Sequence, residues 1–205
     1  MALLHRATLS PTKLELISSW LPSRGWAEGA GEPRALGTYR FDDPADEVGL
    51  EGFVLETGAG VLHVPLTYRG APLEGAEEHL VGTCEHSVLG TRWVYDACAD
   101  PVWVAEAART ILTGATGVDS FFEVDGRVER REPTMTVLGS GDPETPVPAL
   151  GTLTLTEDGA ATTVDAGSLE LVVVRRVGEE PPTPLALTGR WPDADTAVLA
   201  GLRTT

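Results

Sequence analysis

The chain has 205 residues, and its 15 basic and 31 acidic side chains give a formal net charge of −16. That charge repels phosphate backbones and anionic lipid surfaces, so nucleic acids and membranes are poor partners. No apolar run approaches the roughly 20 residues of a membrane-spanning helix, and the first residues lack a signal-peptide pattern. We therefore expect a soluble, cytoplasmic protein.

The residue types that are missing exclude specific chemistry. The sequence has no asparagine and no glutamine, and Lys13 is its only lysine. A kinase loop that holds its second magnesium ion with asparagine cannot be built. Ser10 and Lys13 match the S-x-x-K motif of β-lactamases, but the companion motifs of that chemistry need asparagine and a second lysine. We interpret Ser10 instead as the cap of a helix.

The first predicted helix begins at Ser10–Pro11, because proline is tolerated in the first turn. Leu14, Ile17 and Leu21 recur at helical spacing. Pro22 is expected to end the helix, and a glycine-rich loop over residues 23–33 follows it.

After this loop the apolar period changes to two, which predicts strands. The strands expected in this part are 35–41, 50–56, 61–68, 80–88 and 91–95. Pro65 lies inside the third of them, which indicates an edge strand or a bulge. A second helix is predicted from the N-cap Asp100 to the stop at Gly114.

The chain beyond this helix is predicted to be almost entirely β. The expected strands are 121–124, 128–131, 134–138, 152–156, 161–164, 169–177, 185–187 and 197–202. Asp125–Gly126 is typical of a hairpin turn. Connections this short favour antiparallel pairing. The predicted fold is α+β: a mainly antiparallel sheet with two principal helices packed on it, and a β-rich C-terminal extension.

We expect two domains, 1–130 and 131–205. The second either extends the sheet of the first or forms a small β domain of its own.

Cysteines and histidines give a weak indication of a metal site. Cys84 and His86 are two residues apart on a predicted strand and share a face. A zinc site needs at least three ligands, so Cys98 with His63 or His79 would have to complete it. A reduced, buried pair of cysteines explains the pattern as well, and we assign no metal and no cofactor.

Five tryptophans are candidates for sugar stacking. Trp103 lies on the apolar stripe of the second helix, so we expect it in the core. Trp26 and Trp191 lie in glycine- and proline-rich segments and are expected to be exposed. The candidate ligand-binding residues are Arg24, Trp26, His86, Trp93 and Trp191. No nucleophile motif is present, so no catalytic residue is assigned.

Three segments resemble one family. They are Leu21-Pro22-Ser23-Arg24-Gly25-Trp26-Ala27-Glu28-Gly29, Val64-Pro65-Leu66-Thr67-Tyr68 and Tyr95-Asp96-Ala97-Cys98-Ala99-Asp100-Pro101. Their order and spacing are similar to the N-terminal cap domain of bacterial maltokinases, and the resemblance covers roughly residues 10 to 130. Maltokinases phosphorylate maltose with ATP and feed glycogen synthesis from trehalose.

The chain departs from that family where phosphoryl transfer would occur. The family's catalytic loop is His-Gly-Asp, whereas the four histidines here are followed by Arg, Val, Leu and Ser. The segment 169–176 resembles the strand that carries the ATP-binding lysine, but Val172 stands at the lysine position. Without a phosphate-gripping lysine and a catalytic loop, the chain is not expected to transfer phosphate.

The resemblance implies a non-catalytic binding or regulatory protein of maltose, trehalose and α-glucan metabolism. Its ligand would be an α-glucan or a disaccharide, and a homodimer is possible in principle. One alternative is an interaction module that completes a sugar kinase or a glucan-branching enzyme in another chain. Another is a small-molecule enzyme that uses a carboxylate near His86.

Overall fold

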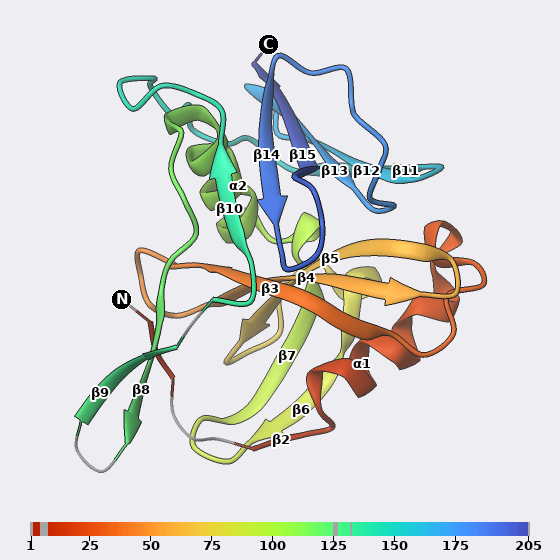
Figure 1. Ribbon diagram of the computed structural model, residues 1–205, viewed down its shortest axis with the longest axis vertical. Helices are drawn as coiled ribbons and strands as arrows, with labels where there is room; N and C mark the ends of the chain where they lie inside the picture. Colours follow the sequence, from red (N-terminus) through yellow and green to blue (C-terminus); the bar gives the residue numbers. More distant parts are fainter. Residues whose placement is uncertain (1, 5–7, 125–126, 132, 205) are drawn as a thin grey trace.

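The computed structural model describes residues 2–4, 8–124, 127–131 and 133–204 (Figure 1). In these residues it contains two α-helices, α1 (Lys13–Trp20) and α2 (Pro101–Thr113), and three β-sheets. The α+β architecture with mainly antiparallel sheets is confirmed. The turn predicted at Asp125–Gly126 lies outside the described residues.

The first sheet has the strand order β2-β6-β7-β5-β4-β3. Its strands are β2 (Leu9–Ser10), β3 (Arg34–Phe41), β4 (Gly49–Thr57), β5 (Gly60–Arg69), β6 (Leu80–His86) and β7 (Gly90–Asp96). All five strands predicted for this segment are confirmed within two residues at each end. The short β2 was not predicted.

The start of α1 differs from the prediction. Ser10 belongs to β2, where it pairs with Glu85 on β6, so it cannot cap the helix. Thr12 is the N-cap instead, and its hydroxyl accepts a hydrogen bond from the Glu15 amide. The Glu15 carboxylate in turn accepts from the Thr12 amide at 2.7 Å. This reciprocal capping box satisfies two amides that the helix leaves unpaired.

Pro65 lies on a central strand, so the prediction of an edge or bulge is wrong. The first half of β5 pairs with the second sheet: the His63 amide donates to the Arg175 carbonyl at 2.9 Å. Its second half pairs with β7 from Leu66 onward. Residues 61, 63 and 65 direct their backbone groups to the same side. Pro65 therefore lies where one partner ends and the next begins.

The C-terminal strands form a sheet of their own, with the order β10-β14-β15-β13-β12-β11. They are β10 (Thr136–Gly139), β11 (Thr154–Asp158), β12 (Ala161–Asp165), β13 (Leu169–Val174), β14 (Leu185–Arg190) and β15 (Ala197–Thr204). Each lies within three residues of its predicted position. A smaller sheet joins β1 (Ala2–Leu4), β8 (Ser120–Val124) and β9 (Arg127–Arg131).

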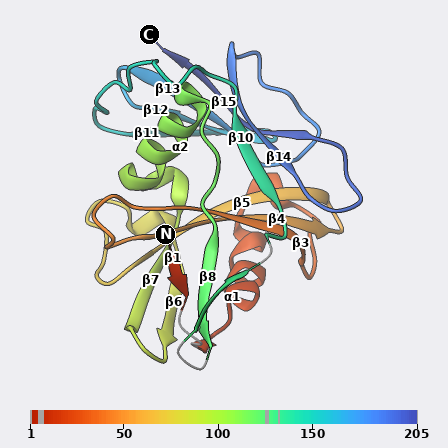
Figure 2. The same ribbon diagram turned by 60° about the vertical axis from the view of Figure 1, so that its left-hand side comes forward.

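Helix α2 lies between the two large sheets, as both views show (Figures 1 and 2). Asp100 caps its first turn through the Val102 amide, and Gly114 ends it at a φ of 65°, as predicted. Its last turn lies against β10 so closely that a side chain at Gly139 would overlap it. A Cβ there would lie 1.9 Å from the Thr110 carbonyl oxygen. None of the described helices is long and apolar enough to span a membrane.

Two clusters of buried side chains fill the interior. One packs α1 against the first sheet and contains Ile17, Trp20 and Phe53. The larger one joins residues of β3 and β4 to α2 and to the second sheet. The core of the second sheet is therefore continuous with that of the first. The domain boundary near residue 130 stays a prediction.

Candidate functional site

A buried ion pair joins the two large sheets. Arg175 follows β13 and has no exposed surface. One of its terminal nitrogens, Nη2, lies 2.5 Å from the Asp96 carboxylate at the end of β7. Its Nε donates to the Thr162 hydroxyl at 2.8 Å, and its guanidinium carbon lies 4.8 Å from the ring centre of Trp26. One arginine thus contacts three elements that are far apart in the sequence.

A buried histidine lies beside this pair. His63 Nδ1 is 3.2 Å from the Val174 carbonyl oxygen, and Nε2 is 3.0 Å from the Tyr39 hydroxyl. Because a carbonyl only accepts, Nδ1 carries the proton, and Nε2 accepts from the hydroxyl. Burial, followed by the nearby Arg175 charge, lowers the pKa of His63 to about 3. His63 is therefore neutral at physiological pH.

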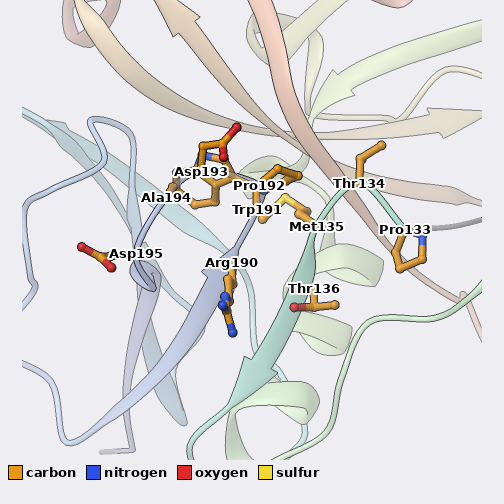
Figure 3. Close-up of a pocket in the computed structure, with 10 residues that line it drawn as sticks. All are labelled: Pro133, Thr134, Met135, Thr136, Arg190, Trp191, Pro192, Asp193, Ala194 and Asp195. Carbon is orange, nitrogen blue, oxygen red and sulfur yellow. The ribbon is translucent and has the colours of Figure 1, made fainter.

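The described part of the chain also contains an open pocket with a volume of about 510 Å³. Its lining comes from the start of β10 and from the turn after β14: Pro133, Thr134, Met135, Thr136, Arg190, Trp191, Pro192, Asp193, Ala194 and Asp195 (Figure 3). We call this the Trp191 pocket.

The first sheet fixes one wall of the Trp191 pocket. The Thr134 hydroxyl accepts a hydrogen bond from the Thr38 amide on β3 at 2.9 Å. Met135 packs onto Gly37 so closely that a Cβ at Gly37 would lie 2.9 Å from the Met135 Cβ. Asp193 has a φ of 61°, which turns the chain sharply along the opposite wall. The pocket is therefore lined by the second sheet and its turns, and β3 of the first sheet holds one of its walls in place.

Its surface combines both charges with apolar groups. Met135 and Trp191 are buried and form an apolar floor. Arg190 is exposed and lies opposite Thr136 across the β10–β14 pair. Among the described residues no carboxylate lies within ion-pair distance of Arg190. The guanidinium is thus available to a ligand.

Residues 20–100 match the maltokinase N-terminal cap domain. This match contains all three segments that carry the resemblance apart from Pro101, and it confirms that resemblance. It spans β3 to β7 and ends at the N-cap of α2, so the second sheet lies outside it. No curated protein matches the chain.

Within the cap domain, the expectation that Trp26 is exposed is wrong. Only 2% of its surface is accessible. Its ring meets Trp20 edge to face at a centroid distance of 5.6 Å, and Arg175 covers it. The Arg176 side chain also donates to the Trp26 carbonyl at 2.7 Å. The loop is fixed by the second sheet, so no ring face is left for a sugar.

The five candidate residues do not form one site. Arg24 lies over the Trp20 ring and 3.8 Å from the Glu157 carboxylate, close to Trp26. His86 and Trp93 point to opposite faces of the first sheet, because His86 pairs with Gly90, three residues before Trp93. Trp191 was also expected to be exposed and is 92% buried, yet it lines the pocket.

The cysteines lie apart. Cys84 belongs to the core under α1, and Cys98 to the larger core beside Arg175. Both are buried and free, and burial raises the pKa of each thiol. In the ranges that the structure describes, no three His, Cys, Asp or Glu side chains lie close enough to hold a metal ion.

Sequence reasoning missed the residues of the ion pair and most of the pocket. Asp96 lies inside the family motif at 95–101, which was interpreted only as the entrance to α2. A buried carboxylate needs a partner, but nothing local indicates that the partner is Arg175, 79 residues away. Arg190 and Met135 have no sequence pattern that sets them apart.

We predict that Asp96→Ala lowers the free energy of unfolding by about 3–5 kcal/mol, because it leaves the Arg175 charge buried without a partner. The matched control is Glu56→Ala, which breaks the exposed pair with Arg34 and should cost less than about 1 kcal/mol. Urea unfolding of both variants measures the difference. Equal losses would contradict a buried ion pair.

His63 should make stability depend on pH. The folded protein holds this histidine neutral down to a pH of about 3, whereas in the unfolded chain it takes up a proton below 6.5. The contribution of His63 to the free energy of unfolding is complete above pH 6.5. It decreases by about 1.4 kcal/mol per pH unit as the pH falls from there toward 3. His63→Gln keeps both hydrogen-bonding roles without titrating, so its urea-unfolding profile should be flatter by this slope. If the stability of His63→Gln and that of the unmodified protein fall in parallel with pH, His63 is not a buried neutral histidine.

Proposed function

We propose that this protein is a non-catalytic binding or regulatory protein of maltose, trehalose and α-glucan metabolism, which takes a neutral disaccharide or a glucan end in the Trp191 pocket. The match to the maltokinase N-terminal cap domain supports the metabolic assignment. The pocket itself is the observation that carries the ligand proposal.

The chemistry of the Trp191 pocket suits a neutral polyhydroxylated ligand. Its volume of about 510 Å³ falls within the roughly 300–1,000 Å³ of small-molecule sites. Sugar hydroxyls donate and accept hydrogen bonds. The pocket supplies a donor in Arg190 and acceptors in the Asp193 and Asp195 carboxylates. A neutral sugar can use the arginine as a donor and the two carboxylates as acceptors at the same opening.

The position of Lys13 supports a role without phosphoryl transfer. This lysine forms an ion pair with Glu51 on β4, so its charge is already neutralised. On β13, Val172 stands at the position that resembles the family's ATP-binding lysine, and it pairs with Gly201 and Thr163 in the second sheet. Neither place offers a lysine to nucleotide phosphates.

Titration of the full chain with maltose, trehalose and glycogen tests the proposal. We expect saturable binding of at least one of them, and about tenfold weaker binding by Arg190→Ala, since charged hydrogen bonds contribute about 1.5–3 kcal/mol. Arg203→Ala is the matched control, because Arg203 is an exposed arginine on β15 paired with Glu170. Trp191 is left intact because it belongs to the core.

Three outcomes would contradict the proposal. Absence of binding to all three sugars would contradict a sugar ligand. Equal sugar affinities of Arg190→Ala and Arg203→Ala would contradict binding in the Trp191 pocket. ATP hydrolysis that rises with added maltose would overturn the non-catalytic role.

A further inference from the structure

The turn between β6 and β7 is held by a histidine side chain. Nδ1 of His86 accepts hydrogen bonds from the Val88 amide at 3.2 Å and from the Leu89 amide at 3.1 Å. His86 pairs with Gly90, whose φ of 73° closes the short loop between them. Aspartate and asparagine are common at this position of a turn, because their side-chain oxygens accept the amides that follow. Here a ring nitrogen has that role, in a chain with no asparagine.

The two bonds to Nδ1 fix the protonation state of the His86 ring. A backbone N–H only donates, so Nδ1 carries no proton, and the proton of the neutral ring is on Nε2. In the imidazolium form both ring nitrogens donate, and Nδ1 would then face two other donors. An ionised aspartate would accept the same amides from about pH 5 to 8, whereas imidazole changes its charge within that range. This turn therefore depends on pH, and a turn held by aspartate would not.

The turn carries two exposed apolar side chains. Val88 and Leu89 have 56% and 52% of their surface accessible. Ser87, which precedes them, is held by β2 and its entrance: its amide donates to the Thr8 carbonyl at 3.0 Å, and its hydroxyl accepts from the Thr8 amide at 3.0 Å. Neither of these contacts uses the Val88 or Leu89 amide. Loss of the two bonds to His86 therefore releases the tip of the turn while its base stays attached.

The charged side chain on the same side of the sheet acts in the same direction as the two amides. Arg92 pairs with Cys84, two residues before His86, so Arg92 and His86 share a face. Its Nη2 also donates to the Leu89 carbonyl at 2.8 Å. A nearby cation opposes proton uptake by the ring, so Arg92 favours the neutral form. The other titratable side chains on the described elements that pack against β6, or on β6 itself, are Lys13 and Glu15 on α1 and Glu85, which points to the opposite face.

We propose that His86 is a pH-sensitive switch for the turn between β6 and β7. With the ring neutral, Nδ1 accepts both amides and holds Val88 and Leu89 in one arrangement. With the ring protonated, both hydrogen bonds are lost and the two apolar side chains are released. The ordered turn is therefore present near pH 8 and is lost as the pH falls toward about 5. None of these residues lines the Trp191 pocket, so this inference does not rest on the proposed function.

Hydrogen exchange at the Val88 and Leu89 amides tests this inference. It is measured by NMR on the full chain between about pH 5 and 8 and corrected for the intrinsic exchange rate. We expect the protection of both amides to fall about fivefold or more toward the acidic end, with the midpoint of the His86 ring signals. His86→Asp should keep the protection throughout, because the carboxylate stays ionised. The matched control His79→Ala removes a histidine just before β6 and should behave like the unmodified protein.

The imidazole nitrogen shifts of the unmodified chain give a second measurement that needs no variant. In its neutral form, His86 should carry a proton on Nε2 and none on Nδ1. A neutral ring with its proton on Nδ1 would overturn the inference. So would amide protection at Val88 and Leu89 that does not change with pH, or the same loss of protection in folded His86→Asp as in the unmodified protein.

Discussion

The Arg175–Asp96 ion pair is the interaction on which the rest of the structure depends. The Arg175 side chain is fully buried and only 2% of the Asp96 side chain is accessible, and removing two charges from water costs several kcal/mol per ion. The pair is tolerable only when its geometry is good and further hydrogen bonds accompany it. Thr162 and the face of Trp26 supply part of that environment. Since Asp96 lies at the end of β7 and Arg175 directly follows β13, this environment exists only when the two sheets are docked.

The contact between the two large sheets also positions the Trp191 pocket. The Thr134 hydroxyl and Met135 both contact β3 of the cap domain, although the residues that line the opening belong to the second sheet and its turns. The part of the chain that matches the maltokinase cap domain packs here against a second sheet, which buries the Trp26 loop and forms a concave surface. This explains why a sugar-binding role built on Trp26 has no structural basis, whereas one built on Trp191 has a pocket.

Local physics predicted most of the secondary structure. The strands of the cap sheet follow from period-two patterning, and α2 follows from Asp100, Pro101 and Gly114, whose capping roles depend only on neighbouring residues. Ser10 failed as a cap because β6 takes it as a strand partner, and that contact is not local. The prediction of an edge strand or a bulge at Pro65 failed because it also depends on a contact that is not local: β5 changes its partner there from the second sheet to β7. Burial of Trp26 also depends on a segment about 150 residues away.

The central claim is that the cap domain and the second sheet fold as one unit around the Arg175–Asp96 pair. Differential scanning calorimetry of the full chain tests it most directly. We expect a single transition whose calorimetric and van't Hoff enthalpies agree, because a shared core and a shared buried charge pair must break together. Two separate transitions, or a calorimetric enthalpy well above the van't Hoff value, would show that the two parts unfold independently and would contradict the account.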